Sequence, residues 1–293
     1  MSASITPEIS TDIIAGLKDG SIVPYLGAGA LQGSVHKQTG QPIPADSDSL
    51  ILAMNNGQPM APKLMYEFAR AAMNQELKKG RSFLTRFLNQ TYADDNWTRA
   101  PLHDWLASIR PPYVIDINRD TQLQQSYADT PHTLIVGVAR IAGSDYRFRI
   151  YHWDGSSYAE IAQEAVDTTL PVLFKPMGTP KPEDNYIASD ADYVDYITEL
   201  MGGFAIPSFL KAARKGKRYL FIGMRMNRDT ERMVLTDIIY DAGTPAAWAL
   251  MPDANAKERR FAARLGIEII DAGVDALLAA TLTDEAEAST IGC

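Results

Sequence analysis

Short apolar runs separated by helical segments are the feature that most limits how this chain can fold. The first run covers residues 22–26 and leads directly into the turn Gly27-Ala28-Gly29. Five later runs have the same character and lie at residues 113–117, 171–174, 219–222, 246–250 and 267–270. Unbroken apolar runs of this length suit the strands of a parallel sheet that is covered on both faces. The pattern therefore predicts an α/β protein with a doubly wound, mostly parallel, Rossmann-like sheet.

The segments between these runs carry apolar residues at helical spacing. In residues 64–73 apolar side chains recur at every fourth position in two registers, and Gly80 stands where such a helix would end. A similar stripe covers residues 233–239. Shorter helices are expected at residues 256–265 and 274–282. Strands and helices thus alternate along most of the chain.

One stretch, residues 132–162, departs from this plan. Its segments alternate apolar and polar residues, and the turn signals Gly143-Ser144-Asp145 and Asp154-Gly155 lie between them. We expect a small antiparallel β meander here, inserted between two βα units.

The chain of 293 residues has room for one large domain or two small ones. The pattern favours a single α/β domain over residues 1–282, followed by a flexible tail over residues 283–293. Residues 34–49 contain Pro, Gly and Ser and are too many for a plain connector. Loops of this length often cover a ligand.

Cysteine content, histidine spacing and charge exclude several classes of protein. The single cysteine, Cys293, rules out a disulfide framework and a Cys-based zinc site. No two histidines are spaced as a metal pair, so we expect no metal site; they are His36, His103, His132 and His152. The net charge of -8 disfavours nucleic-acid binding. No apolar run reaches ~18 residues and the first residues lack a signal-peptide pattern, so we expect a cytoplasmic protein without a membrane partner.

The glycine turn after the first run is the first chemical signal. Gly27 and Gly29 would let the backbone approach a phosphate, and amide groups at a following helix start would favour the anion. The dinucleotide fingerprint places its third glycine at position 32, which is Gln32, and no acidic residue follows a second strand ~20 residues on. A tight strand-to-helix connection explains this turn equally well.

Four segments, in this order, resemble the sirtuin-like family, the silent-information-regulator type. The family's opening glycine motif, usually followed by a serine, is similar to GSIVPYLGAGAL. Its helix, strand and Thr-Thr-Asn-x-Asp motif is similar to PLHDWLASIRPPYVIDINRD, and its Lys-x-His-Gly motif to LFKPMG. Its last core strand, usually ending Gly-Tyr-Ser-x-x-Asp, is similar to YLFIGMRMNRD. The spacing resembles the short, zinc-free prokaryotic branch, which implies a bacterial source, and the resemblance covers residues 19–240.

This resemblance implies a cleft of NAD type over the C-terminal ends of the strands. The residues that would bind NAD or an ADP-ribose-like ligand are Gly27, Ala28, Gly29, Asn118 and Gly223. Asn118 matches the family's asparagine beside the nicotinamide ribose, and Asp120 matches the acid that follows it. These two residues would be catalytic if the chain is active.

The sequence departs from the family at several polar positions of that cleft. Met177 occupies the position of the histidine, and a thioether cannot act as a general base. Leu31 replaces the serine of the glycine motif. Asp116 and Ile117 replace the two threonines, and Asp116 would bring a negative charge near an anionic dinucleotide if it faces the cleft. Together these losses suggest a site that is no longer used for NAD hydrolysis.

Several of these residues also have simpler structural explanations. His103 would lie at a helix start and hydrogen-bond nearby backbone, whereas His36 is the candidate replacement base if chemistry survives. Asn118 would also suit a turn, and Asp120 a helix N-cap. The acids of residues 190–192 are typical of a first helical turn.

A basic cluster stands out against the acidic average. Its members are Lys211, Arg214, Lys215, Lys217 and Arg218. Such a run usually forms a solvated helix end, and the functional alternative is a docking surface for an acidic protein or a phosphate. Arg225, Arg228 and Arg232 follow and would lie at the C-terminal edge of the sheet. Because no aromatic residues interleave the run, nucleic acid is a less attractive partner.

Two classes of function therefore compete. The first is a non-catalytic sirtuin-like module, a pseudoenzyme that binds a protein partner as an interaction or regulatory accessory factor and could retain a nucleotide-like ligand. The second is an NAD-cleaving enzyme, an NAD glycohydrolase of the anti-phage type, which would use Asn118 and Asp120 with a replacement base. The depleted site favours the first. Leu31 and Met177 would make the cleft more apolar than a dinucleotide prefers, which favours a protein partner.

Overall fold

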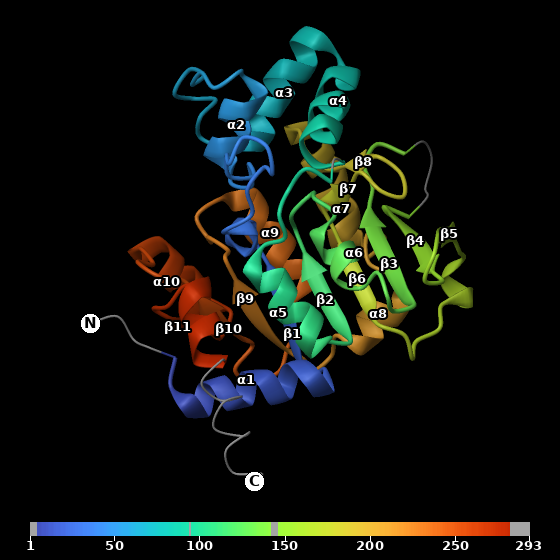
Figure 1. Ribbon diagram of the computed structural model, residues 1–293, viewed down its shortest axis with the longest axis vertical. Coiled ribbons are helices and arrows are strands. Elements are labelled where there is room, and N and C mark those ends of the chain that lie inside the picture. The colour runs from blue at the N-terminus through green and yellow to red at the C-terminus, as the bar shows by residue number, and fades with distance from the viewer. Residues whose placement is uncertain (1–4, 94, 142–145, 282–293) are drawn as a thin grey trace.

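A nine-stranded sheet forms the centre of the molecule (Figure 1). The computed structural model describes residues 5–93, 95–141 and 146–281. The strands follow the order β11-β10-β9-β1-β2-β6-β3-β4-β5 across the sheet. Their bounds are β1 Ile22–Leu26, β2 Tyr113–Asp116, β3 His132–Gly137, β4 Phe148–Trp153, β5 Tyr158–Glu160, β6 Val172–Lys175, β9 Arg218–Ile222, β10 Ala247–Leu250 and β11 Ile267–Ile270.

Neighbouring strands are parallel from β11 to β3 and antiparallel from β3 to β5. The doubly wound, mostly parallel sheet predicted from the apolar runs is therefore confirmed. Helices cover both faces, and the side chains of β1 show why its run is unbroken. Val23 and Tyr25 pack into the core on one face, whereas Ile22 and Leu26 pack into the core on the other.

The helices divide between the two faces. α7, α8, α9 and α10 contribute to the core that contains Val23, and α1, α5 and α6 to the core that contains Ile22. Their bounds are α1 Pro7–Asp19, α5 Pro101–Ile109, α6 Gln122–Ser126, α7 Asp190–Gly202, α8 Ser208–Ala213, α9 Asp229–Ile238 and α10 Ala256–Arg264, with short 3-10 helices η1 Ala28–Leu31 and η2 Gln163–Ala165. Residues 274–281 are also helical. None of these helices is long and apolar enough to cross a bilayer, in the part of the chain that the structure describes.

A separate group of three helices lies at one end of the molecule, the top of Figure 1. We call α2 Ser47–Met54, α3 Phe68–Lys79 and α4 Arg81–Tyr92 the helical module. The module has its own apolar core, to which Leu31 and Ile43 also belong. The expected helix at residues 64–73 is real but begins later, because residues 62–66 form turns. Gly80 ends it as predicted.

The antiparallel meander of residues 132–162 is present as β3, β4 and β5. Its first strand also pairs in parallel with β6, so the meander continues the main sheet to its edge. The turn Gly143-Ser144-Asp145 and the tail of residues 283–293 lie outside the described residues. A small second sheet, β7 Gly178–Thr179 and β8 Asn185–Tyr186, was not anticipated.

Candidate functional site

A cavity of about 230 Å³ lies at the C-terminal ends of the central strands. The strand order reverses between β1 and β9, which is where ligands bind in open α/β sheets. The loops after β1, β2, β6 and β9 line one side of the cavity, and the helical module lines another. Tyr193 of α7 and Glu231 of α9 close a third side. Sequence segments far apart in the chain therefore meet here.

Glycines bring the turns after β1 and β9 into direct backbone contact. Gly29 N donates to Gly223 O at 2.7 Å, and Gly27 N donates to Ile222 O at 2.9 Å. A Cβ atom on Gly223 would lie 2.4 Å from Ala30 N, and its φ of 66° also favours glycine. Of the predicted residues, Gly27 and Gly223 line the cavity together with Ala28, whereas Gly29 packs behind them. This contact explains the glycines without a ligand.

Asn118 lines the cavity and is held by a buried network. Lys175 Nζ lies 2.6 Å from Asp116 Oδ2, and both side chains are fully buried. Asp116 Oδ1 accepts hydrogen bonds from the backbone N and the Nδ2 of Asn118, both at 2.9 Å. Asn118 Nδ2 also donates to Gly27 O at 2.8 Å. Because both partners are acceptors, the amide nitrogen must face them and the carbonyl Oδ1 is left for the cavity.

This network corrects the expectation for Asp116. Its charge is paired with Lys175 and buried beneath Asn118, so it does not face the cavity. A charge pair in the interior avoids the large cost of an isolated buried carboxylate. Asp116 therefore supports Asn118 instead of repelling an anion.

Asp120 lies behind the cavity instead of on its wall. Its Oδ1 accepts a hydrogen bond from Gln122 N at 2.7 Å, a local turn at the start of α6. Burial raises the pKa of Asp120, and the nearby Lys175 opposes that rise. His103 is fully buried and its pKa is lowered by burial. Neither ring nitrogen of His103 has a hydrogen-bond partner among the described residues, so the expected bond to backbone is wrong.

The two residues that replace family residues, Met177 and Leu31, and the candidate replacement base, His36, lie in different environments. Met177 lines the cavity, and its backbone O accepts a hydrogen bond from Ile187 N at 3.1 Å. Leu31 is turned into the core of the helical module, so the prediction that it makes the cleft apolar is wrong. His36 organises its own loop by accepting from the backbone of residues 38 and 39, and its ring meets Trp97 at 5.2 Å. It therefore lies outside the cavity.

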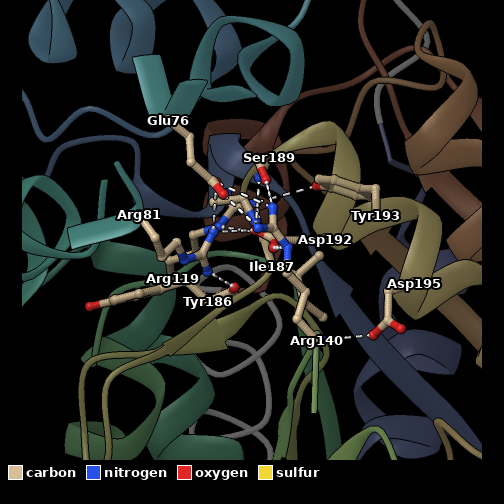
Figure 2. A network of polar contacts seen from close by, with 11 residues as sticks. Glu76, Arg81, Arg119, Arg140, Tyr186, Ile187, Ser189, Asp192, Tyr193 and Asp195 are labelled. Atoms are coloured by element: carbon tan, nitrogen blue, oxygen red, sulfur yellow. Dashed lines mark hydrogen bonds and ion pairs between the residues drawn. The ribbon is translucent and has the colours of Figure 1, made fainter. Parts of the chain in front are cut away.

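Three arginines line the cavity, and each is held by other groups of the protein. Arg119 donates to Ile187 O at 3.0 Å and to Tyr193 OH at 3.3 Å (Figure 2). Arg225 pairs with the buried carboxylate of Glu258 at 2.7 Å. Arg228 stacks over the ring of Tyr66 at 4.4 Å. The sequence indicated Arg225 and Arg228 at this edge but gave no sign of Arg119.

Two glutamates face the same space, and neither was anticipated. Glu67 precedes α3 and accepts a hydrogen bond from Thr230 Oγ1. Burial, followed by the charge of Glu67, raises the pKa of Glu231 to about 7. In the sequence Glu231 is simply one acid in a first helical turn, so a pattern gives no hint of its burial. No group of three or more metal-binding side chains occurs among the described residues.

A polar network fastens the helical module beside the cavity (Figure 2). The fully buried Asp192 of α7 pairs with Arg81 of the module at 2.6 Å and with Arg140 at 2.7 Å. Arg140 in turn reaches Glu76 of α3. Asp192 also caps its own helix with Ser189, as expected of an acid in a first turn. The module is thus tied to α7 by charged groups.

The basic cluster lies at the other end of the sheet, because its members precede β9 or, in the case of Arg218, begin that strand, while the cavity residues follow it. Lys215 is exposed. The other members contact the protein itself: Lys211 donates to Gly203 O, Arg214 to Asp237 O, Lys217 to Gly20 O, and Arg218 lies over the ring of Trp248. The three carbonyls lie at the ends of α7, α9 and α1, where cations are favourable. A docking role for this cluster stays a prediction.

Comparison with known families gives one result. A family model described as a SIR2-like domain matches residues 113–270, which is just over half of the chain. The match extends from β2 to β11 and so includes Asn118, Met177, Gly223 and Glu231. A search of curated proteins finds no match.

Proposed function

The chain belongs to the SIR2-like domain family, and on that basis we propose that it is a non-catalytic member that binds a nucleotide such as NAD or ADP-ribose. The observation that carries this proposal is the side chain of Met177 on the cavity wall. The family resemblance implies a histidine at this position, and a thioether can neither accept nor donate the proton that such chemistry needs. The cavity therefore keeps its location but lacks that base.

The polar groups around the cavity would hold such a ligand. The carbonyl of Asn118 is presented by the Asp116–Lys175 pair and would accept a hydrogen bond from a ribose hydroxyl. The backbone at Ala28 lines the cavity where two glycine turns keep side chains away. A ligand phosphate would approach the Ala28 backbone there, because no bulky side chain stands in front of it. A non-catalytic nucleotide-binding protein of this kind could also act as an accessory factor that binds a protein partner.

Calorimetric titration with NAD and with ADP-ribose tests the proposal. We expect both nucleotides to bind. Asn118→Ala should weaken the affinity for each by about tenfold, because it removes one hydrogen bond to the ligand and the hydrogen bonds from Asn118 to Asp116 and Gly27. Leu31→Met is the control, since Leu31 faces the module's core and this volume-conserving change should leave the affinity unchanged. If neither NAD nor ADP-ribose binds, the proposal is contradicted.

Glu231 favours a second candidate, NAD cleavage. A carboxylate whose pKa is raised to about 7 by burial can exchange a proton near neutral pH. Asp120 lies behind the cavity, so Glu231 is better placed as a replacement base. Nicotinamide release by the wild type that Glu231→Gln abolishes would establish this function instead.

A further inference from the structure

Glu231 is a half-buried acid of the cavity wall that has no hydrogen bond or ion pair among the described residues. Asp48, the other acid of the wall without such a partner, is exposed. We infer that Glu231 is a specificity-determining residue, which makes the cavity prefer a ligand whose buried group is positively charged over the same ligand with that group uncharged. This inference rests on the proposed function, because it requires a nucleotide in this cavity.

Most of the charged groups on the cavity wall are engaged by other groups of the protein. The three arginines of the cavity are engaged by Ile187 and Tyr193, by Glu258, and by the ring of Tyr66. Glu67 accepts a hydrogen bond from Thr230, the residue next to Glu231. The carboxylate of Glu231 therefore stands on the wall without a hydrogen-bonding partner, and the half-buried position of this residue makes its ionised form costly. A cation beside it would relieve that cost.

The groups around Glu231 hold its charge in a balance that pH can change. Burial and the negative charge of Glu67 both raise its pKa, while Arg228, Arg119 and Arg232 oppose the rise without cancelling it. The phenols of Tyr25 on β1 and Tyr193 on α7 also face it. With a pKa of about 7, Glu231 is partly protonated at neutral pH. The cavity can thus change charge within the physiological range.

The charge of the ligand sets the direction in which its affinity changes with pH. A cationic ligand favours the ionised form of Glu231, so its binding releases a proton and strengthens as the pH rises through about 7. A neutral ligand gains nothing from that ionisation. NAD and NADH form a suitable pair, because they carry the same phosphates and differ in the charge of the nicotinamide ring. The ratio of their affinities therefore cancels the effect of Glu231 on the phosphates.

The test is to measure the dissociation constants of NAD and NADH by calorimetry between pH 5.5 and 8.5 at constant ionic strength, with the wild type and with Glu231→Gln. In the wild type the preference for NAD should grow about tenfold over this range, the effect expected for two unit charges a few ångströms apart in a partly buried site. In Glu231→Gln it should stay constant. Asp237→Asn is the matched control, since it lies on the same helix outside the cavity and should behave as the wild type.

A preference that does not change with pH in the wild type overturns the inference, whether or not Glu231→Gln folds. A pH-dependent preference that persists in a folded Glu231→Gln also overturns it. If neither nucleotide binds at any pH, the proposed function fails and the inference falls with it. Binding without pH dependence, by contrast, removes the inference and leaves the proposed function standing.

Discussion

Glu231 combines burial with a titratable charge more clearly than the other residues of the cavity. Its pKa is raised to about 7, whereas an exposed glutamate titrates near ~4.3. The folded protein therefore retains a proton on Glu231 that the unfolded chain releases between these two values. The stability that this proton contributes is fully present in acid and is lost as the pH rises through about 7.

Glu231→Gln should remove this loss. The glutamine side chain cannot ionise, so the variant should exceed the wild type in free energy of unfolding by about 1–3 kcal/mol at pH 8, a range that allows for partial exposure of the side chain. The difference should shrink as the pH falls toward about 5, because both proteins then carry a neutral side chain there. Urea unfolding at several pH values measures it. Equal stability at pH 8 would show that Glu231 is not buried in its charged form.

The residues of the site differ in how far the sequence could predict them. Asn118, Met177 and Gly223 each lie within two residues of the end of a strand. Parallel strands end at one edge of a sheet, so their meeting could be anticipated. The Asp116–Lys175 pair could not, because it depends on the register that sets β2 beside β6. Glu231 was missed because its surroundings form only when distant segments of the chain, which carry Tyr25, Glu67 and Tyr193, meet at the cavity.

At the scale of elements, the backbone contact between the turns after β1 and β9 positions the residues of these turns that line the cavity. Gly223→Ala should destabilise the protein by about 2–4 kcal/mol, because the added methyl group would meet the backbone of Ala30 and the residue has a positive φ. Gly216→Ala is the matched control: its φ of 69° is similar, but a Cβ atom there would meet nothing within 4 Å. Gly216→Ala should lower the free energy of unfolding by about 1 kcal/mol. Thermal unfolding compares the two, and equal losses would contradict a contact between the turns.

The attachment of the helical module is a second property of elements. Asp192→Asn should weaken it, because it removes the charge that holds Arg81 and Arg140. We expect the free energy of unfolding to fall by about 2–4 kcal/mol. Amide hydrogen exchange should accelerate, relative to the wild type, more in α3 and α4 than in β1. Asp190→Asn, in the same helical turn without these ion pairs, is the control. Uniform exchange changes across the sheet would mean that the network does not act on the module.

The elements also show where sequence patterns lose information. The apolar runs predicted the central strands well, because burial on both faces requires apolar residues at every position. The helix expected from residue 64 begins at Phe68, since Leu64 and Met65 pack against the module's core from a turn. Apolar residues in a turn that packs against the core can recur at the same spacing as those in a helix. The pattern therefore does not show where the helix begins. The strand pair β7 and β8 is too short to leave a pattern.

At the scale of the whole molecule, the sheet separates two kinds of surface. The cavity lies at the C-terminal ends of the strands beneath the helical module, and the basic cluster lies at the opposite end, where most of its members cap helices. A ligand in the cavity and a partner at the cluster would therefore not compete for space. The central claim concerns the first of these ends: a SIR2-like cavity that binds its nucleotide without cleaving it.

Incubation of the purified protein with NAD, with free nicotinamide followed over several hours, tests this claim most directly. We predict no release by the wild type at concentrations where calorimetry shows NAD bound, and release once Met177→His restores a titratable side chain to the cavity wall. Sustained release by the wild type that Asn118→Ala abolishes would contradict the claim.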